Sequence, residues 1–130
     1  MTNNYFSFVE MIRTDTGIEN IPNWDQINNL QDLIKYVLNP VREVYGKPIY
    51  VTSGYRSPSV NKAVGGVKTS DHMQGKSADI TTLSIEENKK VFDLIKKHTF
   101  FDQLKLSKGG QFIHVSFRYG KNRLQVIDGD

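Results

Sequence analysis

The 130-residue sequence contains no cysteine. This absence excludes disulfides, thiol nucleophiles and cysteine-rich metal sites, so any metal site must use His, Asp and Glu side chains. Such a donor set is typical of catalytic sites rather than closed structural ones. Long apolar runs are also missing, because no segment approaches the ~20 apolar residues of a membrane span. Residues 1–10 lack the charged and apolar regions of a signal peptide. We therefore expect no membrane insertion and no export by a signal peptide.

An excess of charge of one sign is nearly absent as well. The 17 Lys and Arg residues and 14 Asp and Glu residues give a formal net charge of +3. The densest basic stretch lies in one predicted helix and comprises Lys89, Lys90, Lys96 and Lys97. This pattern is typical of a solvated helix face, whereas a nucleic-acid surface requires a stronger concentration of cations. We therefore expect no nucleic-acid partner, although a mildly basic chain suits an anionic polymer such as a bacterial cell wall.

The first half of the chain has helical signals. A capping box at Ser7 and Glu10 predicts a short helix that fades near Thr14. From Trp24 the apolar residues recur at helical spacing, with a kink or break expected at Pro40. Two further helix starts follow, one at Ser57-Pro58 and one at a second capping box formed by Ser84 and Glu87.

Strand signals dominate the last third. Short β-branched or alternating segments predict strands near residues 49–53, 78–82, 104–106, 113–117 and 124–127. Glycine-containing turns separate the last three strands, and residues 67–77 read as an ordered loop. The length suits one compact domain over residues 1–130. We therefore predict a monomeric α+β protein with a small, mainly antiparallel sheet flanked by helices.

Two of the three histidines are candidates for chemistry. His98 ends the lysine-rich helix, a favourable position that needs no further function. His72 lies in the loop seven residues before Asp79, and strand alternation points His114 away from its apolar neighbours. Two imidazoles and a carboxylate suit Zn²⁺ and leave one position for a water, whose pKa falls toward ~7. Spacing alone leaves open that these are merely hydrogen-bonded polar residues.

Three blocks of sequence resemble those of the D-alanyl-D-alanine carboxypeptidase-like zinc peptidases. Residues 70–79, SDHMQGKSAD, are similar to the motif Ser-x-His-x-x-Gly-x-Ala-x-Asp of this family. Residues 51–57, VTSGYRS, resemble its Ser-Gly-Tyr-Arg segment, and residues 112–116, FIHVS, resemble its second-histidine strand. The family includes L-alanyl-D-glutamate endolysins, D-Ala-D-Ala dipeptidases and, more distantly, the hedgehog signalling domain. The blocks occur in family order within residues 38–117.

The resemblance implies both a site and a reaction. It implies that His72, Asp79 and His114 hold one zinc ion, and that Arg56 stabilises substrate or the developing oxyanion. Ser70 becomes a candidate substrate-binding residue, although a serine there also suits a cap of the metal loop. The implied reaction is hydrolysis of peptidoglycan stem or cross-link peptides that contain D-amino acids, by carboxypeptidase or endopeptidase action, with zinc-activated water as the nucleophile.

Gln111 departs from the family pattern. Three residues before the second histidine the family usually has an Asp or Glu that acts as general base, and a neutral amide orients water without accepting its proton. Three alternatives follow: Asp71 or Asp102 takes the proton, the metal acts without a base, or the domain is a catalytically weak zinc-containing module that binds cell wall. The range of the family, with no signal peptide in this chain, implies a phage or bacterial lytic enzyme. It would stay cytoplasmic until released to the wall.

Overall fold

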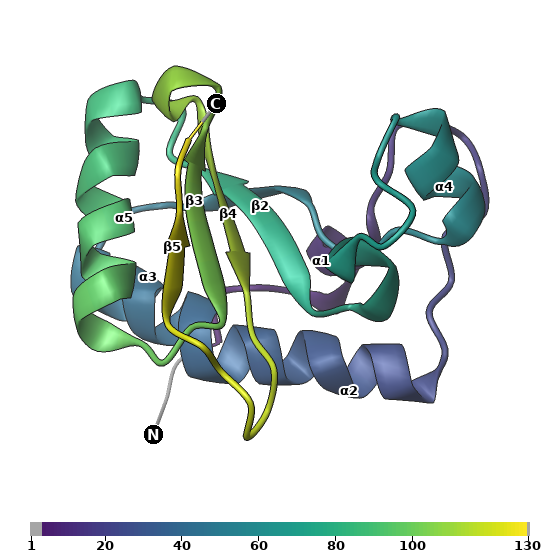
Figure 1. Cartoon of the computed structure of the whole chain (residues 1–130), viewed down its shortest axis with the longest axis horizontal. Coiled ribbons are helices and arrows are strands. Elements are labelled where there is room, and N and C mark those ends of the chain that lie inside the picture. Colours follow the sequence, from purple (N-terminus) through teal and green to yellow (C-terminus); the bar gives the residue numbers. More distant parts are fainter. Residues whose placement is uncertain (1–3, 130) are drawn as a thin grey trace.

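The computed structural model describes residues 4–129 (Figure 1). Along the chain, helices precede most of the strands. The helices are α1 (Phe8–Ile12), α2 (Trp24–Leu33), α3 (Asn39–Tyr45), α4 (Pro58–Ala63) and α5 (Ile85–His98), with a π-helical segment η1 (Ile34–Leu38) and 3₁₀ turns η2 (Asp71–Gln74) and η3 (Lys108–Gly110). The strands are β1 (Tyr50–Ser53), β2 (Ser77–Thr81), β3 (Gln103–Ser107), β4 (Phe112–Ser116) and β5 (Gln125–Ile127).

The strands form one sheet in the order β1-β2-β4-β3-β5. Neighbouring strands are antiparallel except for β3 and β5, which run parallel. Figure 1 shows α5 beside the sheet, α2 running below the strands, and α4 set apart on the opposite side from α5. The prediction of an α+β fold with a small, mainly antiparallel sheet flanked by helices is therefore confirmed.

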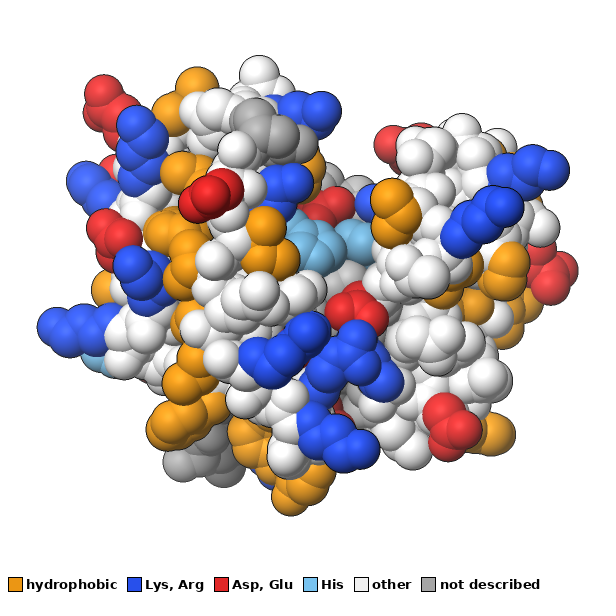
Figure 2. Space-filling view, viewed as in Figure 1, with side chains coloured by type: hydrophobic (Ala, Val, Ile, Leu, Met, Phe, Trp, Pro, Cys, Tyr) orange, Lys and Arg blue, Asp and Glu red, His pale blue; other side chains and the backbone are white. Residues whose placement is uncertain are grey.

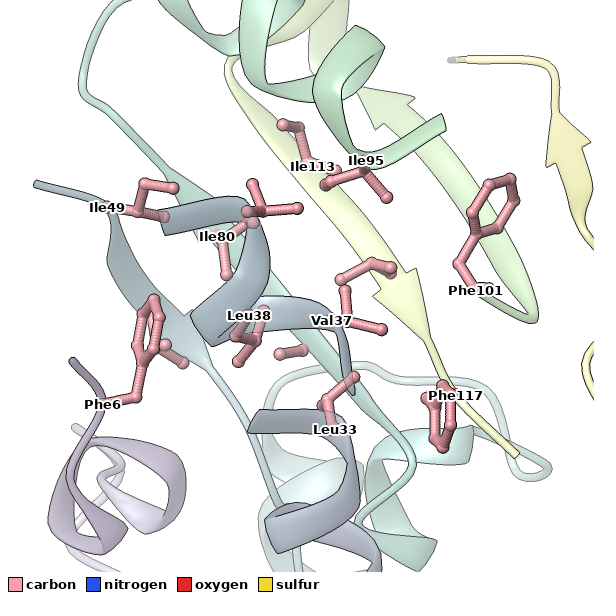
Figure 3. Close-up of a cluster of buried hydrophobic side chains, with 14 of the residues drawn as sticks. Phe6, Leu33, Val37, Leu38, Ile49, Ile80, Ile95, Phe101, Ile113 and Phe117 are labelled. Atoms are coloured by element: carbon pink, nitrogen blue, oxygen red, sulfur yellow. The ribbon is translucent and has the colours of Figure 1, made fainter. Parts of the chain in front are cut away.

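The two faces of the sheet differ in chemistry because side chains alternate along a strand. On one face, the central strands place fully buried apolar residues, including Ile80 of β2 and Ile113 of β4. These pack with residues of α5 and of the α2–η1 segment, as Figure 3 shows for Ile95, Leu33, Val37 and Leu38. The other face is mainly polar, and it carries the candidate metal ligands Asp79 and His114.

Pro40 does not break the long helix, contrary to one of the two outcomes expected for it. Instead the chain widens into η1 immediately before it, and the Asn39 N–H donates to the Ile34 carbonyl five residues earlier. A proline lacks an N–H and its ring crowds the carbonyl four residues before it, so a π-turn upstream relieves both constraints. The helix then ends at Gly46 in a left-handed conformation.

The predicted helix starts are present, with one correction. Ser7 and Glu10 form a reciprocal capping box, and the Ser57 side chain caps α4. Ser84 also caps α5, but its own N–H donates to Thr82 Oγ1 rather than to Glu87. The Glu87 carboxylate instead binds Lys90, Lys47 and Tyr45, and these contacts lower its pKa to about 2. The second capping box is thus only half formed.

A buried carboxylate connects β3 to the C-terminal segment. Asp102 has a fully buried side chain, and it accepts hydrogen bonds from Arg123 Nε and Nη2, both at 2.8 Å, and from Arg118 Nε at 3.1 Å. The hydrogen bonds from Arg123 lower the pKa of Asp102 to about 2.

Within residues 4–129, none of the helices has the length and apolar character needed to cross a membrane.

The Asp102→Asn variant is expected to lose about 2 kcal/mol of unfolding free energy at pH 7, since the native pKa lies below the usual value near 4. The native carboxylate is stabilising above pH 4, and this contribution disappears as the pH falls through 2. Urea unfolding of both proteins between pH 7 and pH 3 should show the difference shrinking with acidity. Asp93→Asn, on the exposed surface of α5, is the control. A difference independent of pH would contradict the assignment.

Candidate metal centre

Asp79 and His114 lie directly opposite each other in the β2–β4 ladder. Residues opposite each other in an antiparallel pair share one face of the sheet, with Cβ atoms about 5 Å apart. His114 Nδ1 lies 2.9 Å from Asp79 Oδ1. Both side chains are on the polar face, as the alternation along residues 113–117 predicted for His114. The sheet register therefore assembles two of the three candidate ligands.

His72 reaches the same carboxylate from the turn η2. The Ser70 side chain caps this turn by accepting a hydrogen bond from the His72 N–H at 3.2 Å. Gly75 ends the turn with a φ of 72°, and a Cβ atom there would lie only 2.5 Å from the Gln26 carbonyl oxygen of α2. Glycine is required at such a position. The turn directs His72 Nε2 to within 3.3 Å of Asp79 Oδ1.

A backbone carbonyl fixes the proton of His72. The Gly54 oxygen lies 2.7 Å from His72 Nδ1, and a carbonyl only accepts hydrogen bonds, so Nδ1 donates the proton. In the neutral ring Nε2 then carries a lone pair that faces the Asp79 oxygen. Metal-binding histidines are oriented in this way by a partner on their other nitrogen. A Cβ atom on Gly54 would lie 2.2 Å from the Met11 carbonyl oxygen, so glycine permits the backbone of α1 to lie close to residue 54.

The three side chains are suited to hold a cation. Their candidate donor atoms all lie within 4.8 Å of one another. The Nε2 lone pair of His72 and an Asp79 oxygen face each other, and two acceptors at this distance repel unless a proton or a metal ion lies between them. Burial raises the pKa of Asp79, but the hydrogen bond from His114 outweighs it and holds that pKa well below its usual range. Nitrogen and carboxylate donors in a set of three match a zinc site with one open position.

Arg56 lies against the second oxygen of Asp79. Its Nη2 is 3.4 Å from Asp79 Oδ2, while Nε donates to Ser53 Oγ at 3.0 Å and Nη1 donates to Asn61 Oδ1 at 3.2 Å. Its side chain is 16% exposed, so the guanidinium is held in place at the border of the metal centre. The surface around the histidines is hollowed, with blue Lys or Arg side chains next to them (Figure 2).

The other predicted site residues have different surroundings. Gln111 is exposed, and its carbonyl accepts from Thr81 Oγ1 and Asn88 Nδ2, both at 3.0 Å. The observed side-chain contact of Ser70 is the cap of the metal loop. His98 is exposed at the end of α5, where its helix position explains it.

Two carboxylates considered as alternative bases are both bound by Arg118, a residue that the sequence did not single out. Arg118 Nη2 lies 2.5 Å from Asp71 Oδ1, and Arg118 Nε lies 3.1 Å from Asp102 Oδ2. Asp102 is fully buried in this network, where Arg118 and Arg123 bind its carboxylate. No local motif marks Arg118, because its two partners are 47 and 16 residues away in the sequence.

Zinc binding can be tested with ligand variants. Wild type purified without added metal should carry close to one zinc per chain, while His72→Ala and His114→Ala should lose it. Added zinc should raise the Tm of the metal-free wild type, since a ligand that binds only the folded state stabilises it. The measurements are elemental analysis and thermal unfolding, with circular dichroism to verify folding. His98→Ala is the matched control and should behave as wild type. Full zinc content in both ligand variants would refute the site.

The chain matches the family model described as peptidase M15 over residues 4–116, which include every residue of the candidate metal centre. No curated protein matches it. M15 peptidases are zinc-dependent, in agreement with the donor set that the fold assembles. The chain belongs to the peptidase M15 family.

Proposed function

We propose that the protein is a zinc metallopeptidase that hydrolyses peptide bonds in bacterial peptidoglycan, in stem or cross-link peptides that contain D-amino acids. Membership of the M15 family supports metallopeptidase activity in general. The observation that carries the proposal is the convergence of His72, Asp79 and His114 on a hollowed polar face beside Arg56. The sequence blocks similar to D-alanyl-D-alanine carboxypeptidases support the choice of substrate.

The residues of the chain have distinct tasks in this reaction. His72, Asp79 and His114 hold the metal, which when bound lowers the pKa of a water to ~7 and polarises a carbonyl group. Gly54 fixes the tautomer and the orientation of His72 through the 2.7 Å hydrogen bond. Arg56 places a permanent positive charge beside Asp79, where it stabilises negative charge that develops on the scissile carbonyl oxygen.

The activity test uses purified chain with peptidoglycan fragments in the presence of zinc. New amine termini should appear, disappear after chelation, and return when zinc is restored. His114→Ala should reduce the rate to background, because it removes one of the three metal ligands. The His114 side chain is partly exposed, so the fold should tolerate its removal. The products, separated by mass, show which bond is cut and whether the enzyme acts as a carboxypeptidase or an endopeptidase. Absence of zinc-dependent cleavage at high enzyme concentration would refute the proposal.

A second candidate function is a catalytically weak, zinc-containing domain that binds cell wall. Two observations favour it. Gln111 cannot accept a proton, and Arg118 binds the carboxylates of both Asp71 and Asp102. A hydrolase without a general base lacks a contribution of typically ~10²–10⁴-fold in rate. Such a domain would still bind wall peptides through Arg56 and the metal.

Gln111→Glu distinguishes the two functions. In a weak hydrolase the new carboxylate is expected to raise kcat by at least about ten-fold, a fraction of the usual contribution of a general base. Peptidoglycan cleavage and wall binding are measured together, and Gln31→Glu on exposed α2 controls for the added charge. A large rise in cleavage with unchanged binding would identify the native chain as a binding domain. An unchanged rate, already typical of peptidases, would eliminate that candidate.

A further inference from the structure

The η2 turn, which carries His72, is fixed at its end by helix α2. Gln26 Nε2 donates to the Met73 carbonyl at 3.1 Å, and Asn29 Nδ2 donates to the Gln74 carbonyl at 2.8 Å. These amide hydrogen bonds hold the two residues that follow His72 in the turn. The orientation of the turn also depends on its beginning, because a short segment held at one end can still rotate about that end.

The beginning of η2 is held by an ion pair from the segment after β4. The first residue of the turn is Asp71, whose Oδ1 lies 2.5 Å from Arg118 Nη2 and whose side chain is only 16% exposed. A hydrogen bond from a guanidinium to a carboxylate is strong because both groups are charged. This contact fixes the residue that directly precedes His72. Helix α2 and Arg118 thus hold the turn on both sides of the candidate ligand.

Arg118 is itself anchored at a fully buried carboxylate. Its Nε donates to Asp102 Oδ2 at 3.1 Å, and its backbone N–H donates to Asn122 Oδ1 at 2.7 Å. Asp102 also accepts two hydrogen bonds of 2.8 Å from Arg123, so this anchor does not depend on Arg118 alone. The guanidinium is planar and its donors are fixed relative to one another, so the contact with Asp102 directs Nη2 toward Asp71. Arg118 therefore joins a buried anchor to the first residue of the metal loop.

We propose that Arg118 is a positioning residue of the metal centre, which sets the orientation of η2 and thereby the place of His72 Nε2 relative to Asp79. The inference rests on the proposed function, because zinc at this centre is its premise. Removal of a group that orients a metal ligand typically weakens metal binding by about 10–100-fold. Loss of the contact between Arg118 and Asp71 should therefore weaken zinc binding and change the coordination geometry while the fold persists.

The first test is the zinc Kd of the metal-free chain, measured by competition with a chromophoric chelator. Arg118→Met should raise the Kd by at least about ten-fold. Asp71→Asn removes the other half of the ion pair, leaves the contact of Arg118 with Asp102 in place, and should raise the Kd by a similar factor. The double variant should bind zinc no more weakly than either single variant, because two changes that break one interaction do not add. Circular dichroism verifies folding, and Asp71→Asn decides by itself if Arg118→Met does not fold.

Arg123→Met is the matched control. It removes two hydrogen bonds from the same buried carboxylate and so lowers the stability, but it leaves the contact between Arg118 and Asp71 in place. Its zinc Kd should stay within about three-fold of wild type, because no group that orients a ligand is lost. Co²⁺ in place of zinc reports the coordination geometry. The visible absorption of the cobalt-loaded chain should change in Arg118→Met and remain as in wild type in Arg123→Met.

Three outcomes would overturn the inference. They are an unchanged zinc Kd in both Arg118→Met and Asp71→Asn, an equal weakening in Arg123→Met, and losses that add in the double variant. The hydrolysis assay judges the proposed function separately. Zinc-dependent cleavage by wild type, with an unchanged Kd in the variants, refutes the role of Arg118 alone. Weakened zinc binding in the variants, with no cleavage by wild type, refutes the peptidase proposal alone.

Discussion

The pairing of Asp79 with His114 across β2 and β4 is the constraint on which the rest of the site depends. A slip of one residue in this register would turn the whole set of side chains to the other face of the sheet. Ile80 and Ile113 would then leave the core and the ligands would enter it. The apolar packing against α5 and α2 therefore stabilises the register that brings the candidate metal ligands together. Burial of the core and assembly of the site are enforced by the same alternation.

Hydrogen bonds from backbone and side chains then complete what the sheet begins. The η2 turn brings His72 to the pair, and the Gly54 carbonyl sets its tautomer from the end of β1. Arg56 borders the same carboxylate, so Asp79 accepts from His114 at one oxygen and from Arg56 at the other. A buried carboxylate that receives so many donors stays ionised, which is the state required of a metal ligand. The site is thus rigid on the side of its ligands.

The distribution of charge around this rigid centre bears on what the protein does with a substrate. Arg56 borders the candidate ligands, while Gln111 leaves the usual position of the general base neutral. Arg118 forms ion pairs with Asp71 and Asp102, the two carboxylates that the sequence analysis named as alternative general bases. The candidate metal centre is therefore bordered by a guanidinium, while a neutral amide stands at the usual position of the base. The origin of the general base is thus the central question for the proposed reaction.

The sequence by itself determined the helix starts, most strands and the two faces of the sheet, because capping and alternation are local signals. It suggested the candidate ligand set only through the resemblance of its motifs to a family. Only the tertiary structure decided the path through Pro40, the partners of Glu87 and the contacts of Asp102. Those depend on groups far apart in the chain, as the 47 residues between Asp71 and Arg118 show. Local physics predicts which residues face which way, and only the fold decides which of them meet.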